Sequence, residues 1–464
     1  MYCFSIGLYK ISDIARECRT NNILRVATCG KTPSINVFRR FLLESDPLVL
    51  KKLFLYSVVK LNDLNFINFL KFFIDGTNAI INGSRNYTIS KDEIKALKYM
   101  KKNGLLHNNR KKSKSESYNK LKKIQSEIDK NSELYEQIEL IFNKFDIFNK
   151  NIYKNISVFE QIMKERDIDY VSIAFPESVM MKTKKGGFDF AFNLQEVMTD
   201  NKIILTGLLL DKPNDHYSLE EIIQEIKENI QIILELQEKY GERKNYKEIQ
   251  STIEKALFIC DSGYFTTENI ETADKHGMKF LIMPKIISNR ENNKKRRKKK
   301  IKAKDKNKQN KNKESKKSLE RVYNGYICKK GHKIELTEIK KVKKRVNIRK
   351  GISEQWEEHR FIHKCSNPER YSTCSECPFK EITDNYTPLE YEMINKFTNQ
   401  KYLKLYKDRF HCSEGINGYL KSTNGTIILS GHNYIAVKNE LQIHNLIYNL
   451  QRMVNLKGTF YWKK

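Results

Sequence analysis

The stretch FFIDGT, residues 72–77, decides the fold that we expect, and ALFICDSGYF at residues 256–265 repeats its pattern. In the first stretch an apolar run delivers the carboxylate of Asp75 into a Gly-Thr turn, within a strand, turn and strand over residues 69–88. In the second, an apolar run delivers Asp261 into a Ser-Gly turn. A buried strand is rigid, so an acid at its carboxyl end is held in place and faces a cleft. Two such acids from distant parts of the chain predict one shared metal site.

The segment that leads to and follows Asp261 alternates between strand and helix patterns. Strand patterns lie at residues 188–197, 202–210, 256–261 and 280–285. Between them we expect a long amphipathic helix at 212–241, in which Ser218 and Glu221 form a capping box, and a shorter helix at 266–277. Strands and helices in this order predict an α/β fold with parallel strands.

Changes of pattern and composition divide the whole chain into parts. We expect a helical N-terminal region over 1–67, a catalytic core over 68–288 with a helical insertion at about 90–160, a Lys-rich low-complexity loop over 289–320, a Cys/His insertion over 321–385, and the rest of the core over 386–464. The Lys-rich loop is either a sliding contact on DNA phosphates or a tolerated surface insertion.

The N-terminal region has helical spacing, with Ser12 as its candidate N-cap. The section Ser12–Arg40 resembles a helix-turn-helix, which would expose basic side chains to DNA. These side chains are Arg16, Arg19, Arg39 and Arg40. The alternative, which we favour, is a helical pair that packs on the catalytic core.

The net charge points to a polyanionic partner. The 464 residues include 86 Lys and Arg against 56 Asp and Glu, a formal charge of +30. Such a chain binds nucleic acid through the release of counterions. A genome with a codon bias toward Lys would explain part of the excess, but the charge acts on DNA whatever its origin.

The rest of the composition indicates the compartment. The sequence contains no run of about 18 apolar residues, so it predicts no membrane span. The first residues, MYCFSIGLYK, lack the basic and then apolar order of a signal peptide. The nine cysteines are scattered, unlike those of a disulfide scaffold. We expect an intracellular protein whose cysteines are reduced.

A third acid follows near the C-terminus, in LYKDRFHCSEGINGYLKS at residues 405–422. Glu414 and Lys421 are seven residues apart, so on a helix they would share one face. Tyr406 and Arg409 precede them. An acid among basic side chains suits a site that holds both metal and phosphate. Taken alone, Glu414 and Lys421 would be an ordinary surface charge pair.

Taken together and in order, these motifs resemble those of the DDE transposases of bacterial insertion sequences. The motifs are FFIDGT, FNLQ with IILTGLLL and PND, FICDSGYF, and Y-x2-R-x4-E-x6-K. The resemblance is to the branch with iDGT and DxGY motifs, and it runs from Ser5 to about Asn455. It implies an RNase H-like fold: a mixed sheet flanked by helices, here with an N-terminal helical region and a basic, Cys-containing insertion. Members usually have more residues before the first helices, so we expect an N-terminally truncated copy.

The resemblance also implies the site. Asp75, Asp261 and Glu414 match the acidic triad, which binds two Mg²⁺ or Mn²⁺ ions, and Tyr406, Arg409 and Lys421 match the residues that bind DNA. The partners would be double-stranded DNA, as element ends and target, and a second copy of the chain. The resemblance thus implies a cytoplasmic protein associated with the bacterial nucleoid. Two metals on carboxylate oxygens suit phosphodiester cleavage and attack by a freed 3′-hydroxyl.

Other functions stay open at this point. The chain could be an inactive relic that only binds DNA, a host RNase H-like nuclease that cuts without joining, or a basic RNA-binding protein. The residues around the third acid favour a transposase or its relic.

The Cys/His insertion carries a candidate structural zinc site. Its four thiols would be Cys328, Cys365, Cys374 and Cys377, with His332 or His363 as substitutes. The C-x2-C pair at 374–377 has good spacing and its partners do not, so four reduced thiols are an equal alternative.

Further acids compete with the triad. These are Asp189, Asp200, Asp211 and Asp215. Asp215 precedes a helix, where we expect its side chain to cap or shape a turn. We expect Asn193 and Gln195 to support the core.

Overall fold

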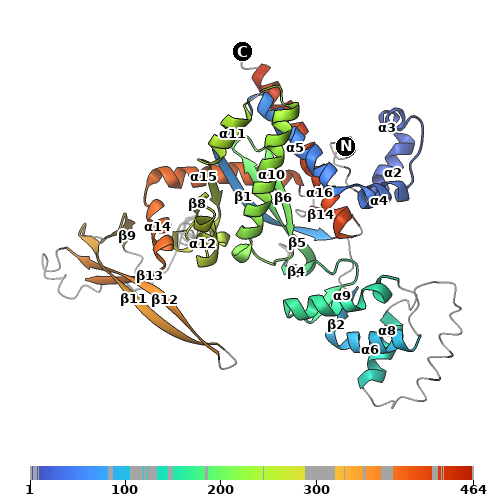
Figure 1. Cartoon of the computed structure of the whole chain (residues 1–464), viewed down its shortest axis with the longest axis horizontal. Helices are drawn as coiled ribbons and strands as arrows, with labels where there is room; N and C mark the ends of the chain where they lie inside the picture. Colours follow the sequence, from blue (N-terminus) through green and yellow to red (C-terminus); the bar gives the residue numbers. More distant parts are fainter. Residues whose placement is uncertain are drawn as a thin grey trace, which may run out of the picture.

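A computed structural model describes residues 8–461 of the chain, apart from residues 82–86, 105–132, 145–149, 183–185, 288–318, 349–351, 367–379 and 421–426, nearly all of each range, and a few single positions. Figure 1 shows a central sheet between helices, with a β-ribbon and a helical lobe that project away from it.

The central sheet is mixed. Its described strands are β1 (Lys71–Ile81), β4 (Val179–Lys182), β5 (Phe188–Thr199), β6 (Ile204–Leu210), β7 (Leu257–Cys260), β8 (Lys279–Ile282) and β14 (Ile427–Leu429). They follow the order β4-β5-β1-β7-β8, with β6 also paired to β5 and β14 to β1. β5 is antiparallel to β1, β4 and β6, whereas β7 and β14 run parallel to β1, and β8 runs parallel to β7. This mixed sheet with flanking helices is consistent with the RNase H-like fold, so the α/β prediction is confirmed.

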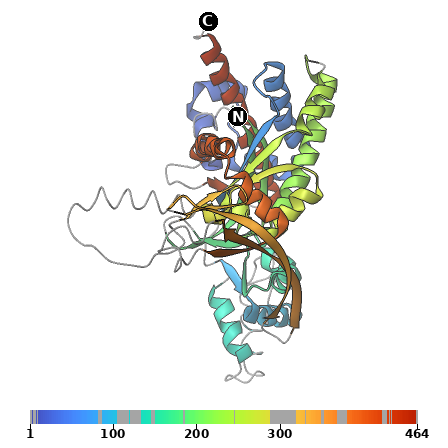
Figure 2. The ribbon, with the colours of Figure 1, turned by 90° about the vertical axis from the view of Figure 1, so that its left-hand side faces the viewer.

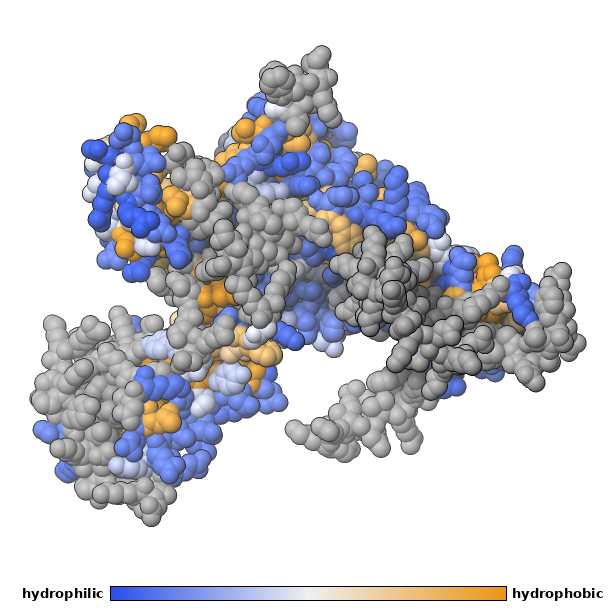
Figure 3. Space-filling view, turned by 180° about the vertical axis from the view of Figure 1, so that it is seen from behind, coloured by the Kyte–Doolittle hydropathy of each residue, from blue (hydrophilic) through white to orange (hydrophobic). Residues whose placement is uncertain are grey.

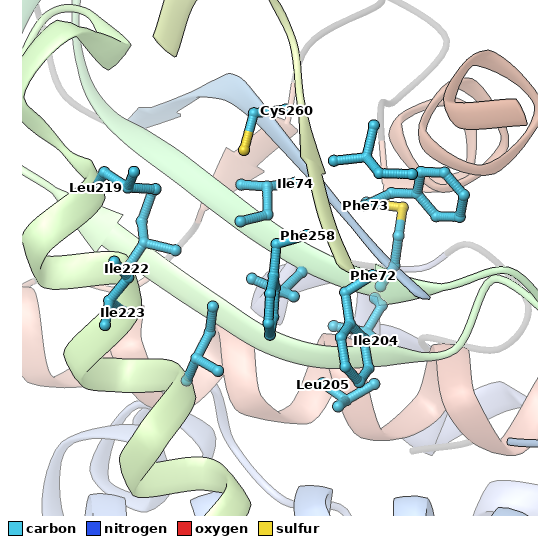
Figure 4. Close-up of a cluster of buried hydrophobic side chains, with 14 of the residues drawn as sticks. Phe72, Phe73, Ile74, Ile204, Leu205, Leu219, Ile222, Ile223, Phe258 and Cys260 are labelled. Atoms are coloured by element: carbon cyan, nitrogen blue, oxygen red, sulfur yellow. The ribbon is translucent and has the colours of Figure 1, made fainter. Parts of the chain in front are cut away.

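Helices cover the sheet because its strands are apolar on both faces. The helices around it are α5 (Pro47–Asp63), α10 (Leu219–Tyr240), α11 (Tyr246–Ile253), α12 (Thr267–Lys275), α14 (Pro388–Lys396), α15 (Gln400–Leu420) and α16 (Tyr434–Tyr461). The rings of Phe72 and Phe258 stack at 5.0 Å and lie beside Ile226 of α10. Figure 4 shows this core, with α10 side chains on one side of β1 and β7. The packing fixes the two strands that carry the predicted acids.

The expected turn at Gly76 and Thr77 is wrong. β1 continues through both residues to Ile81, because β5 pairs with it from Phe72 to Ile80 and β14 takes over its other edge from Ala79. Asp75 therefore lies inside a strand rather than at its end.

Three short helices form the N-terminal region: α2 (Ile11–Thr20), α3 (Asn22–Ala27) and α4 (Ile35–Glu44). Ile14 and Cys18 pack against Ile447 of α16, as in the alternative of a helical pair on the core. The predicted cap at Ser12 is wrong, because α2 begins at Ile11 with Lys10 as its N-cap. Apolar side chains such as Val26 and Phe41 remain exposed here, and Figure 3 shows apolar patches over this region.

A helical lobe follows β1. It contains β2 (Thr88–Ser90), α6 (Lys91–Lys102), α8 (Glu133–Lys144), α9 (Lys150–Arg166) and β3 (Tyr170–Ser172). Ile94 and Leu97 of α6 pack with Phe159 of α9 in a cluster of their own. This lobe therefore has a hydrophobic core separate from that of the sheet.

The Cys/His insertion folds as a second, antiparallel sheet. Its described strands are β9 (Glu320–Val322), β10 (Gly325–Ile327), β11 (Lys333–Ile348), β12 (Ile352–Cys365) and β13 (Glu381–Tyr386). β11 and β12 pair over almost their full length, and Figure 2 shows that the resulting ribbon curves. The Lys-rich loop lies almost entirely outside the described residues. Within the described part of the chain, no helix has the length and apolar run needed to cross a membrane.

The predicted capping box at the start of α10 does not form. Ser218 is the N-cap residue, but its hydroxyl donates to the carbonyl of Asp215 instead of accepting from the helix. Glu221 pairs with Lys212. A 3-10 turn, η1 (Asp215–Tyr217), precedes the helix and changes the direction of the chain.

Candidate active site

Asp75 and Asp261 come together because β1 and β7 are parallel neighbours. Phe73 lies opposite Ile259 in this pair. Two residues further along both strands, the same register sets Asp261 beside Asp75 on the same face. The two acids are 186 positions apart in sequence. The sheet alone therefore brings these two predicted acids together.

Arg409 of α15 lies between the two carboxylates. Its Nη1 donates to Asp75 Oδ1 at 2.9 Å, and its Nη2 lies 3.8 Å from Asp261 Oδ2. The Arg409 side chain is 7% exposed, so it pairs with the acids out of bulk water. A planar guanidinium can bridge two carboxylates in this way. In this structure one buried cation occupies the point where the two acids converge.

Asp261 begins the turn η2 (Ser262–Tyr264), and its Oδ1 accepts from Gly263 N at 2.7 Å. Burial raises the pKa of Asp261, and the negative charges of Asp75 and Asp215 raise it further, whereas Arg409 opposes the shift. Carboxylates crowded in a partly buried site bind protons, or other cations, more readily than isolated ones. The positive charge that the structure places beside them is the guanidinium of Arg409.

Asp215 also reaches this site. Its Oδ1 accepts from Asn193 Nδ2 at 3.0 Å and from Gln195 Nε2 at 2.7 Å. Gln195 in turn accepts from the hydroxyl of Tyr264. The sequence predicts that the side chain of Asp215 caps or shapes a turn. The predicted cap is wrong, because the side chain of Asn214 caps η1. Asn193 and Gln195 lie in the core, as expected, and there they hold this carboxylate.

The remaining predicted site residues lie on or after α15. Tyr406 is buried against Phe397 and Phe410, and its ring lies 5.6 Å from the Arg409 guanidinium. Glu414 is on α15, but its side chain lies outside the described residues, as does all of Lys421. Their roles stay predictions.

Two of the other competing acids, Asp200 and Asp211, form pairs away from this site. Asp200 accepts from Asn68 at 3.0 Å and lies 3.8 Å from Lys71, and Asp211 pairs with Arg166. The salt bridges at these two positions are ordinary and partly exposed.

The donor set suits a hard divalent cation. Asp75 and Asp261 offer carboxylate oxygens, which Mg²⁺ and Mn²⁺ prefer, and their convergence on one guanidinium marks a place for positive charge. Among the residues whose side chains are described, no group of three His, Cys, Asp or Glu is arranged to hold a metal. A metal at this site would therefore need a further ligand, and Glu414 is the predicted one.

The candidate zinc site is described only in part. Cys328 and Cys365 are free thiols that contact the same apolar cluster in the second sheet, while Cys374 and Cys377 lie outside the described residues. His363 does not suit a substitute ligand, because its ring nitrogens lie 3.2 Å from Ile382 O and 2.9 Å from Tyr391 Oη.

Comparison with known families adds one finding. Residues 229–450 match the transposase DDE domain. The match supports a transposase function with DNA as the substrate, and it covers a little under half of the chain. No curated protein and no solved structure matches the chain.

The transposase DDE domain match includes Asp261, Arg409 and Glu414 but begins within α10, after Asp75. The pairing of β1 with β7 is what places Asp75 at the same site. The sequence analysis did not predict that Arg409 bridges Asp75 and Asp261. The spacing of residues in the motif around Arg409 gave no signal for this contact. The PND motif includes Asp215, but it gave no sign that the Asp215 carboxylate points toward β5 and the two predicted acids.

Proposed function

We propose that this chain is a DDE transposase that cleaves insertion-sequence ends and joins the freed 3′-hydroxyl to target DNA. The observation that carries the proposal is the convergence of Asp75 and Asp261 on the buried guanidinium of Arg409. Two carboxylates and a guanidinium brought together out of bulk water are a frequent arrangement in catalytic sites. The family match over residues 229–450 supports the transposase reaction class.

In this proposal Asp75, Asp261 and Glu414 hold two Mg²⁺ or Mn²⁺ ions. When bound, such ions activate the attacking oxygen and stabilise the leaving oxygen of a phosphodiester. The rigid strands β1 and β7 keep Asp75 and Asp261 at fixed spacing. Arg409 neutralises part of their charge and keeps both carboxylates on one side of the sheet before DNA arrives.

DNA binding would rest on the basic charge of the chain and on the residues around the third acid. The net charge of +30 favours DNA through counterion release. We propose Lys421 as a direct phosphate contact, and Tyr406 and Arg409 as residues that reach DNA only if α15 shifts, since both are buried. Joining two ends would need a homodimer, acting on DNA in the cytoplasm. A structural Zn²⁺ on Cys328, Cys365, Cys374 and Cys377 also remains part of this proposal.

The test uses the purified chain and a supercoiled plasmid that carries the DNA flanking its own gene, with Mg²⁺ or Mn²⁺. We expect nicks at the element ends and joined products, both abolished by Asp75→Asn and by Asp261→Asn. Asp274→Asn, an exposed acid on α12, is the matched control and should cut normally.

The alternatives give different products in the same assay. Nicking without joining would indicate a nuclease, and binding without nicking would indicate a relic. Cleavage that survives Asp75→Asn would contradict the assignment of the site.

A further inference from the structure

Asp215 lies at the proposed active site, although it belongs to a different segment from the predicted triad. It begins η1, between β6 and α10, and the side chain of Asn214 caps this turn by accepting from His216 N at 3.1 Å. The Asp215 carboxylate is therefore not needed for the turn. It instead points back over the sheet to β5.

The carboxylate of Asp215 is held in one position. Asn193 and Gln195 both donate to its Oδ1, at 3.0 Å and 2.7 Å. Gln195 is fully buried, and its own oxygen accepts from the buried hydroxyl of Tyr264. A carboxylate held by buried amides loses little freedom when a charged ligand binds nearby.

Because Gly76 and Gly263 have no side chain, the carboxylate of Asp215 can lie close to the backbone next to each of the two acids. A Cβ added to Gly76 would lie 2.7 Å from Asp215 Oδ1, and a Cβ added to Gly263 would lie 3.1 Å from Asp215 Oδ2. The Cβ added to Gly263 would also lie 2.9 Å from Asp261 Oδ1. Gly76 follows Asp75 directly, and Gly263 lies two residues after Asp261. Asp215 therefore packs against the backbone that carries each acid.

These residues together carry more negative than positive charge. Asp75, Asp261 and Asp215 supply three carboxylates, and Arg409 supplies the one guanidinium among these four residues. The excess negative charge favours a divalent cation at the site.

Taking the proposed function as its basis, we propose that Asp215 is a positioning residue for the metal-binding acids. It holds the backbones beside Asp75 and Asp261 at a fixed spacing through its contacts at Gly76 and Gly263. Its charge also raises the affinity of the site for Mg²⁺ or Mn²⁺. It acts through Asp75 and Asp261, and its fixed Oδ1 already accepts two hydrogen bonds.

The test measures Mn²⁺ binding to the full chain directly, by the loss of the electron paramagnetic resonance signal of free Mn²⁺. Asp215→Asn can still accept from Asn193 and Gln195, but it removes the charge. We expect its half-saturating Mn²⁺ concentration to rise by about tenfold, and the Mg²⁺ requirement of end cleavage to rise in parallel. The affinity for DNA without metal should not fall. Asp211→Asn makes the same charge change away from the site and should leave Mn²⁺ binding unchanged.

Several outcomes would overturn the inference. An Asp215→Asn protein with altered thermal stability but an unchanged Mn²⁺ midpoint would give Asp215 a purely structural role. If this variant does not fold, Asp215→Ser provides the same measurement with a smaller side chain, and an unchanged midpoint there is equally decisive. A wild-type chain that binds no Mn²⁺ would also end the inference.

The experiments separate failure of the transposase proposal from failure of the inference about Asp215. A wild-type chain that binds Mn²⁺ in an Asp75-dependent manner, but never cuts DNA, would contradict the transposase proposal and leave the role of Asp215 intact. A chain that cuts DNA with a Mn²⁺ midpoint insensitive to Asp215→Asn would do the reverse.

Discussion

Arg409 Nη1 donates a hydrogen bond to Asp75 Oδ1 at 2.9 Å, across 334 positions of sequence. The contact joins a helix near the C-terminus to the first strand of the sheet, and it also brings the guanidinium to 3.8 Å from Asp261. A residue whose family counterpart is expected to contact DNA thus pairs with the predicted catalytic acids. In this structure the positive charge beside the carboxylates of Asp75 and Asp261 comes from a side chain of the chain itself, Arg409.

Replacement of Arg409 by Gln should destabilise the protein, because it leaves Asp75 and Asp261 close together without their cation. Loss of one partner of a buried ion pair costs about 3 kcal/mol. Added Mn²⁺ should restore part of this stability, and raise the melting temperature of the variant more than that of the wild type. Differential scanning fluorimetry with and without Mn²⁺ measures both effects.

The control for this experiment is Arg16→Gln, which removes an exposed i,i+3 pair with Asp13. It should change stability by less than about 0.5 kcal/mol. Equal Mn²⁺ shifts in wild type and Arg409→Gln would show that the guanidinium and the metal do not share a site.

Gly76→Ala should impair the site without unfolding the chain. The added Cβ would lie 2.7 Å from both Asp215 Oδ1 and Gln195 Nε2, so the side chains that fix Asp215 must move. Overpacking of this kind costs about 1–3 kcal/mol, and Mn²⁺ binding should weaken with it. Urea unfolding and a Mn²⁺ titration provide the two measurements. Gly458→Ala, at an exposed position of α16 where an added Cβ meets nothing within 4 Å, should leave Mn²⁺ binding unchanged and raise stability by about 0.5–1 kcal/mol through helix propensity.

Asn449→Leu should destabilise the packing of α16 on β6. The Asn449 side chain accepts from Ile204 N at 2.9 Å and donates to Ile204 O at 2.9 Å, and it also donates to Ser57 Oγ at 3.1 Å. Leucine would leave these buried groups without their partner, at a cost of about 3 kcal/mol in total. The free energy of unfolding in urea tests this, with the exposed Val454→Ala as its control. A loss below about 1 kcal/mol would mean that other groups satisfy Ile204.

His363 should make the second sheet sensitive to acid. Burial lowers the pKa of His363, and the carboxylate of Asp384 opposes this shift without cancelling it. The unfolded chain, with a histidine pKa of about 6.5, therefore takes up a proton that the folded sheet disfavours. Stability is present above that pH and is lost as the pH falls below it, by at most about 1.4 kcal/mol per unit.

His363→Gln should remove this loss, so that the melting temperature falls less between pH 7 and pH 5 than it does in the wild type. Tyr391→Phe also breaks the 2.9 Å contact with His363 Nε2 but keeps the histidine, and it should retain the wild-type pH dependence. Parallel pH profiles for wild type and His363→Gln would rule out His363 as the source.

Local sequence was enough for the main elements of the catalytic core. Apolar runs such as FFI and LFIC predict buried strands because they are short, rich in aromatic and β-branched residues, and followed by turn residues. The alternation around residues 188–197 predicted β5 for the same reason. Local rules failed at Ser12 and at the Ser218 capping box, where the hydroxyl of Ser218 bonds to Asp215 instead of the helix. They also missed the long ribbon of β11 and β12, whose charged residues hide its strand pattern.

The sequence by itself marked Asp75 and Asp261 as candidate site residues, because each comes directly after an apolar run within a recognisable motif. Only the tertiary structure decided what surrounds them. The parallel pairing of β1 with β7 sets the two acids side by side, and α15 brings Arg409 between them. The side chains of β5 turn Asp215 toward the same place. These contacts join residues far apart in the chain, and their energies depend on burial and on summed charge, which no local pattern encodes.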